Sequence, residues 1–125
     1  MKVELPNNEI LDIYSQLEVK MNKDDGSQML ETRYENMRQT VNHIWKMVQF
    51  QEDTIDHWRL MLEGLYEELY NVNLTLYNTR DIMRAHEEHN KFGDDYVELC
   101  RTIYNLNEEK EVIKKRIASI VDLIA

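Results

Sequence analysis

Apolar residues recur at alternating spacings of three and four along most of the first two thirds of the chain. Written as one heptad register, this stretch has the d positions Leu30, Met37, Ile44, Gln51, Trp58, Leu65, Val72, Thr79 and His86. The a positions are Tyr34, Val41, Val48, Ile55, Leu62, Leu69, Leu76, Met83 and Asn90. Only four of these eighteen positions are polar. Such spacing is typical of a coiled coil and predicts one long helix over about 28–90.

Shorter patterns predict a helix on either side of the long one. Pro6 followed by two asparagines is typical of a helix start, and turn-forming residues from 22 onward end the helix predicted over about 8–22. Gly93 can adopt the left-handed conformation that ends the long helix. A second apolar register predicts a C-terminal helix over about 95–124. Because the connection is short, this helix is expected to fold back along the long one.

The expected fold is therefore all-α: an elongated antiparallel helical hairpin with one long central helix, in a single domain of residues 1–125. The alternative is a compact four-helix bundle, in which the long helix breaks near residues 51–54 or at Gly64, since glycine costs about 1 kcal/mol in a helix interior. The heptad phase continues through both places, which favours the unbroken helix.

The middle of the long helix carries an apolar band that is wider than a heptad seam, between Trp45 and Leu62. The flanking helices are too short to cover it, and an exposed patch of this size is unusual for a monomer. The sequence therefore predicts a homodimer formed through the coiled coil, with its orientation open. The predicted oligomer interface consists of Val41, Ile44, Val48, Gln51, Ile55, Trp58 and Leu62.

Aromatic and acidic residues beside the seam predict a second surface that binds another protein. Tyrosine combines a large apolar ring with a polar tip, which suits a protein interface. Alternatively, the acidic residues could mimic nucleic-acid phosphates and inhibit a DNA- or RNA-handling enzyme, as in small acidic proteins of mobile elements. The predicted partner surface consists of Trp45, Phe50, Tyr66, Tyr70, Tyr77, Glu52, Asp53 and Asp56.

Charge and cysteine content limit which partners the protein can bind and which cellular compartment it is expected in. The chain has 15 Lys and Arg against 24 Asp and Glu, a net charge of −9 that disfavours direct nucleic-acid binding. Its one basic cluster, Lys110 to Arg116, is interpreted as a complement to a helix dipole. The single cysteine, Cys100, is expected to be half-buried between helices. With no disulfide, no leader and no apolar run long enough for a bilayer, a soluble cytoplasmic protein is expected.

Candidate catalytic and metal-binding residues are few. His86 and His89 share a helix face but lack a third ligand, and His86 is expected to be a hydrogen-bonded seam residue. The pairs Glu9-x-x-Asp12 and Glu108-x-x-Glu111 partly resemble the acidic motifs with which all-α nucleotide pyrophosphohydrolases bind magnesium, although their order is reversed. That resemblance implies such an enzyme as a remote alternative.

The sequence thus favours a non-enzymatic intracellular protein that homo-oligomerises and binds or inhibits another protein. It contains no Gly-rich phosphate loop, nucleophile elbow or Cys-x-x-Cys motif. We expect no catalytic residue, no metal, no other cofactor and no small-molecule substrate.

Overall fold

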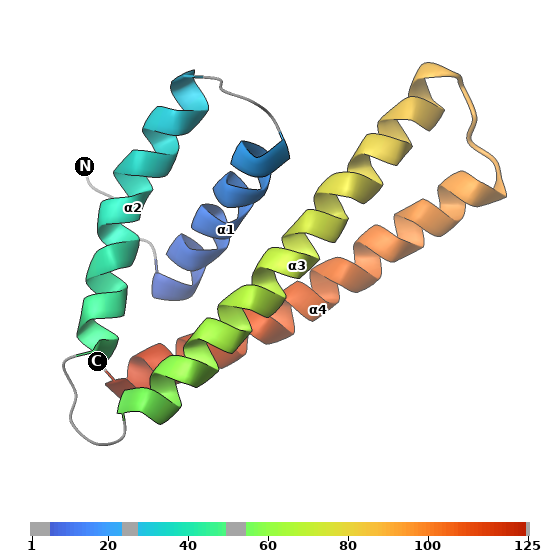
Figure 1. Ribbon diagram of the computed structural model, residues 1–125. Coiled ribbons are helices and arrows are strands. Elements are labelled where there is room, and N and C mark those ends of the chain that lie inside the picture. The colour runs from blue at the N-terminus through green and yellow to red at the C-terminus, as the bar shows by residue number, and fades with distance from the viewer. Residues whose placement is uncertain (1–5, 24–27, 50–54, 125) are drawn as a thin grey trace.

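The computed structural model consists of four α-helices: α1 (Asn7–Lys23), α2 (Gln28–Gln49), α3 (Ile55–Glu88) and α4 (Asp94–Ile124). It describes residues 6–23, 28–49 and 55–124, with side chains for all of these except 28–29, 47–49, 55–57 and 123–124. Successive helices run in opposite directions and pack as a four-helix bundle (Figure 1). The predicted all-α class is therefore confirmed.

The predicted single helix over 28–90 is wrong, because the chain turns back between α2 and α3. Helix α2 ends at Gln49 and α3 begins at Ile55 (Figure 1). Val41 and Ile44 of α2 are buried in the same core as Leu62 of α3. Both helices present their apolar stripe to one core, so the heptad spacing continues unchanged across the turn. The spacing therefore does not show where the turn lies. The compact bundle, and not the hairpin with one dominant helix, is the observed architecture.

The end of α3 is set by Asn90 and not, as predicted, by Gly93. Asn90 adopts a left-handed φ of 53°. Its amide donates to the Glu87 carbonyl at 3.1 Å, and the Lys91 amide donates to the His86 carbonyl at 2.8 Å. These two bonds form a Schellman cap, which satisfies carbonyls that a helix end leaves free. Asparagine accepts the left-handed conformation more readily than other side chains do.

The core fills only one half of the α3–α4 pair. Buried residues of α3 lie between Leu62 and Thr79, and those of α4 between Ile113 and Val121. Helices α1 and α2, with 17 and 22 residues, are much shorter than α3 and α4, with 34 and 31. They therefore cover the half of the pair that lies away from the α3–α4 turn (Figure 1).

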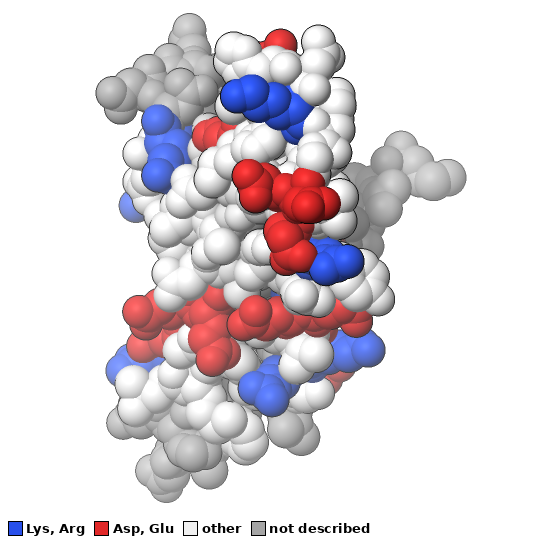
Figure 2. Space-filling model, turned by 90° about the vertical axis from the view of Figure 1, so that its right-hand side faces the viewer, with Lys and Arg blue, Asp and Glu red and all other residues white. Residues whose placement is uncertain are grey.

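The other half of the pair projects as a two-helix arm, defined here as residues 80–112 (Figure 1). None of these residues is buried. Viewed from this side, the molecule shows a band of acidic side chains with basic ones above and below it (Figure 2). None of the helices, over the residues described, combines the length and the hydrophobicity that a membrane span needs.

Ile117→Ala tests the position of the core. Ile117 is fully buried, so its truncation should leave a cavity and lower the free energy of unfolding by about 2–5 kcal/mol. Ile82→Ala makes the same change at an arm residue that is 50% exposed, and should cost less than about 1 kcal/mol. Urea denaturation measures both values. Similar losses in the two variants would contradict this core.

Candidate functional site

The described part of the predicted oligomer interface lies inside a single chain. Val41, Ile44 and Leu62 are buried in the core, and Trp58 is half-buried and packs against it. Helices of the same chain cover these side chains, so they give no reason for self-association. The side chains of Val48, Gln51 and Ile55 lie outside the described part, and for these three the interface stays a prediction.

The predicted partner surface is divided among different environments. Trp45 and Tyr66 point into an interior aromatic cluster, and the Tyr70 hydroxyl accepts a hydrogen bond from the Asn22 amide at 2.6 Å. Tyr77 is half-buried beside a hollow between α1 and α3. The structure thus does not bring these tyrosines together on one face. The side chains of Phe50, Glu52, Asp53 and Asp56 lie outside the described part of the structure, so for these four the partner surface stays a prediction.

The aromatic cluster joins α1, α2 and α3. Tyr14 stacks on Tyr34 with ring centroids 5.0 Å apart, and its hydroxyl donates to the Tyr34 hydroxyl at 2.8 Å. Tyr66 lies 6.2 Å from Tyr14 and meets the edge of Trp45 at 6.4 Å. Stacked and edge-on pairs of this kind add stability beyond the area they bury. The cluster therefore holds the first three helices together.

Burial changes the acidity of two tyrosines in this cluster. It raises the pKa of Tyr14 well above the ordinary value, and the hydrogen bond with Tyr34 adds to this. Burial raises the pKa of Tyr66 further, and the nearby Glu18 carboxylate adds to that effect. The Tyr66 hydroxyl has no hydrogen-bond partner among the described residues. The fold therefore favours the neutral form of both phenols over the ionised form.

A buried polar network joins α1 to α3 and α4. The Asp12 carboxylate accepts a hydrogen bond from the Asn73 amide at 3.1 Å and forms an ion pair with Lys110 Nζ, also at 3.1 Å. The same Asn73 amide donates to the buried Ser15 hydroxyl at 3.1 Å. Lys114 Nζ lies 3.7 Å from Asp12 Oδ2. Because one carboxylate is shared by three donors from two helices, α1 is held in a single register.

Lys114 is the second centre of this network. Its ammonium group bonds Glu9 at 2.6 Å and Glu111 at 3.3 Å. Burial alone would lower the pKa of Lys114, but the bonds to Glu9 and Glu111 and the charge of Asp12 raise it overall. Lys110 and Lys114 therefore pair with α1 and do not lie in the last turn of α4, so the interpretation of these two residues as complements to a helix dipole is wrong.

These contacts also bear on the resemblance to pyrophosphohydrolases. Glu9, Asp12 and Glu111 do converge, but two lysine ammonium groups lie among them. A magnesium site of that family would leave its carboxylates open to the ion. Over the described part of the chain, no three His, Cys, Asp or Glu side chains form a group that could hold a metal ion. The carboxylates of this network are paired with Lys110 and Lys114.

The histidine near the arm tip behaves as the sequence suggests. His86 Nδ1 donates to the Ile82 carbonyl at 3.0 Å, and the ring lies 6.3 Å from Tyr96. The Tyr96 hydroxyl donates to Glu87 Oε1 at 2.8 Å, and Phe92 packs edge-on against the Tyr96 ring. These contacts tie the α3–α4 turn to the end of α3, and the predicted hydrogen bonding of His86 is confirmed.

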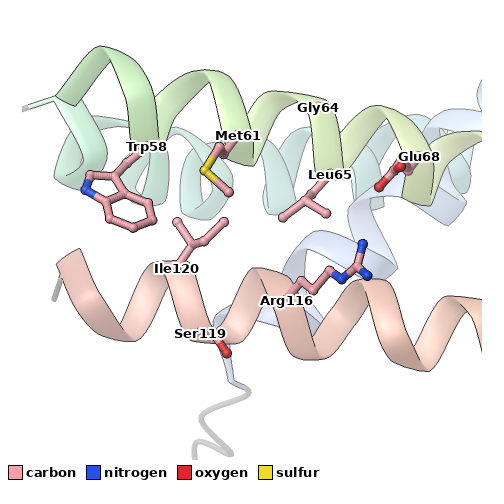
Figure 3. Close-up of a pocket in the computed structure, with 8 residues that line it drawn as sticks. All are labelled: Trp58, Met61, Gly64, Leu65, Glu68, Arg116, Ser119 and Ile120. Atoms are coloured by element: carbon pink, nitrogen blue, oxygen red, sulfur yellow. The ribbon is translucent and has the colours of Figure 1, made fainter. Parts of the chain in front are cut away.

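An apolar groove lies between α3 and α4 at the bundle end (Figure 3). It has a volume of about 610 Å³, and its apolar wall includes Trp58, Met61 and Ile120. Gly64 leaves it open, since a Cβ there would meet no atom within 4 Å. Glu68 and Arg116 point toward one another across one end (Figure 3). Ser119 supplies the hydroxyl of this lining, and that hydroxyl donates to the Lys115 carbonyl at 3.0 Å.

Several exposed apolar side chains lie on the arm, outside the predicted interface and partner surface. Val97 and Tyr104 lie seven residues apart on α4, with exposures of 44% and 66%. Cys100 lies between them and is exposed, so its predicted half-burial is wrong. Ile82 and Phe92 are also about half exposed. The signal that could have revealed this face is the seven-residue spacing of apolar residues outside the α4 register.

Comparison of the chain with known protein families, with curated proteins and with solved structures finds no match. Any functional proposal therefore rests on the geometry described above.

Asp12→Ala tests the polar network. The change removes the carboxylate that Lys110 and Lys114 share, leaves buried charge uncompensated, and should lower the free energy of unfolding by about 3–5 kcal/mol. Glu35→Ala is the control, because it breaks an exposed pair with Arg38 and should cost less than about 1 kcal/mol. Chemical denaturation distinguishes the two. A loss for Asp12→Ala as small as for Glu35→Ala would show that the network contributes little.

The tyrosine cluster predicts a loss of stability at alkaline pH. The folded pKa values of Tyr14 and Tyr66 are raised, so the folded state keeps protons that the unfolded chain releases above about pH 10. Their stability contribution is complete below that pH and falls as pH rises. Tyr66→Phe should recover about 1 kcal/mol of the loss between pH 9 and 11, measured by urea denaturation. Tyr104→Phe, outside the cluster, should follow the unmodified protein; an identical profile for Tyr66→Phe would refute the linkage.

Proposed function

We propose that this chain is a non-catalytic interaction protein that self-associates through its two-helix arm and binds another protein with its remaining surface. The observation that supports the proposal most directly is the absence of any buried residue from 80 to 112, although this stretch carries several large apolar side chains. A protein whose longest helices extend well beyond its core offers that extension to contacts with other chains.

The seam between α3 and α4 continues into the arm, where Ile103 and Leu106 still pack against the core, but its cover is lost toward the arm tip. In the bundle half, Leu69, Leu76 and Ile117 are buried by all the packed helices. In the arm, Met83 and Leu99 hold equivalent seam positions and are only half-buried. A two-stranded coiled coil of this length is a weak unit by itself, and further helices packed on it would complete the burial.

A second copy of the chain is the occupant that we favour for the arm. Val97, Cys100 and Tyr104 follow the i, i+3, i+7 spacing that places side chains on one helix face. Two such faces packed antiparallel around a two-fold axis place Val97 of one copy against Tyr104 of the other. Cys100 then lies beside the axis. A two-fold contact needs only one self-complementary surface, and is the commonest form of assembly.

Sedimentation velocity over a micromolar concentration series tests this dimer. Tyr104→Asp should raise the dissociation constant at least about tenfold, because it puts a charge at the centre of the contact. Leu60→Asp is the matched control: Leu60 is 61% exposed, but it lies on α3 at the bundle end, so its variant should dimerise like the unmodified protein. Neither change touches the core, and both variants should remain folded.

A bifunctional maleimide of short span gives a second measurement. Because Cys100 is the single cysteine, a covalent dimer reports that two Cys100 side chains lie close together. The reagent should cross-link the unmodified protein and Leu60→Asp, and should fail with Tyr104→Asp. A strict monomer at all concentrations, or a dimer that is indifferent to Tyr104→Asp, would contradict self-association through this face.

A further inference from the structure

A small hollow lies where α1 ends against α3. It has a volume of about 240 Å³ and is lined by Gln16, Val19 and Lys20 of α1 and by Asn73, Tyr77, Arg80 and Arg84 of α3. Three of these seven residues are cations and none is acidic. The chain has a net charge of −9, so its basic residues are outnumbered by its acidic ones. A hollow whose charged lining residues are all basic is therefore unexpected in this molecule.

Two of the three cations have no counter-charge. Over the described residues, Lys20 and Arg80 form no ion pair, although acidic side chains are abundant in this protein. Arg84 pairs with Asp81 at 2.9 Å, but both side chains are more than half exposed, and such surface pairs are weak. Positive charges that face one hollow repel one another, and an anion between them would remove that repulsion.

The polar groups of the hollow supply donors. Lysine, arginine and the tyrosine hydroxyl all donate hydrogen bonds. The Tyr77 hydroxyl and Gln16 amide have no hydrogen-bond partner within the described part of the chain. Asn73 is already committed, because its amide bonds Asp12 and Ser15 behind the hollow. The complementary ligand is therefore rich in acceptors and negatively charged. The buried Val19 forms an apolar side of the hollow and leaves no acceptor there.

A simpler account assigns Lys20 to the end of α1. It lies in the last turn of that helix, where a cation offsets the partial negative charge of the helix dipole. That dipole corresponds to only about half an elementary charge. It leaves Arg80 without compensation, and Arg80 belongs to another helix. The dipole therefore explains the position of one cation, but it does not explain why three cations line one hollow.

We propose that this hollow binds the phosphoryl group of a phosphate or phosphomonoester dianion. Such a group carries close to two negative charges at neutral pH and presents three acceptor oxygens to donors from several directions. Arginine and lysine are the side chains that recognise it, with arginine contributing two parallel donors. A single carboxylate would offer half the charge and would satisfy fewer of the donors that line the hollow.

NMR titrations at constant ionic strength test the site with two probes, inorganic phosphate and O-phosphoserine. Either should shift the amide signals of Lys20, Tyr77 and Arg80 in a saturable way. Arg80→Gln should weaken binding about tenfold, which is the typical effect of losing one charge-assisted contact. Arg101→Gln is the matched control, because Arg101 pairs with Glu98 at 2.8 Å as Arg84 pairs with Asp81, but lies away from the hollow. Its affinity should change by less than about twofold.

Stronger binding of O-phosphoserine assigns the site to a phosphorylated group on a larger molecule, and stronger binding of inorganic phosphate assigns it to the free ion; both support the proposal. The proposal fails if no saturable shift occurs, if Arg101→Gln weakens binding as much as Arg80→Gln, or if acetate binds as tightly as phosphate. Arg80 is exposed, so its replacement leaves the core intact. These outcomes are independent of the oligomeric state of the protein.

Discussion

The whole structure depends on a difference in length between the helices that share one apolar core: α1 and α2 are shorter than α3 and α4. An amphipathic helix must bury its apolar stripe against other elements, and a two-helix pair leaves that stripe half exposed. Helices α3 and α4 have 34 and 31 residues, whereas α1 has 17. The chain therefore has one end with a closed core and one end without. Burial is concentrated at the first end, and the second end exposes several of its large apolar side chains.

The buried polar network determines where this division falls. Apolar contacts alone would tolerate a helix that slides by a turn, because they have no direction. Asp12 is bonded by Asn73 and Lys110, and Lys114 is bonded by Glu9, so α1 has one longitudinal position on both long helices. Directional buried groups that fix register are a known use of polar residues in helical proteins. That position fixes the point on α3 at which α1 stops giving cover.

Much of the core could be predicted from the sequence, because the heptad pattern reports which side of a helix faces other helices. The predicted seam contains Ile44, Leu62, Leu69 and Leu76, and all four are buried. The positions of the first and last helices also follow from local signals. The break between Gln49 and Ile55 agrees with the alternative of a break near residues 51–54, whereas α3 continues through Gly64. The heptad pattern alone could not decide between the unbroken helix and the bundle, since a helix that folds back onto the same core keeps its phase.

The candidate sites were harder to predict, because they depend on contacts between distant segments. Trp45 and Tyr66 lie beside the seam of a straight helix and would be surface residues there; once α2 folds back, they meet Tyr14 in the interior. Asp12 and Asn73 are 61 residues apart, and no local pattern pairs them. One signal was present: Lys110 occupies a seam position in the α4 register, and a lysine there requires a buried acidic partner.

One structural boundary accounts for both proposed binding surfaces. Helix α1 ends at Lys23. The part of α3 that extends past this end is not covered by α1. On the apolar side of α3, the missing cover leaves Met83 half-buried; on the polar side, it leaves Arg80 and Arg84 beside a hollow. A longer α1 would have covered both. The arm and the basic hollow therefore belong to one arrangement, in which the length of the first helix decides how much of α3 is available to other molecules.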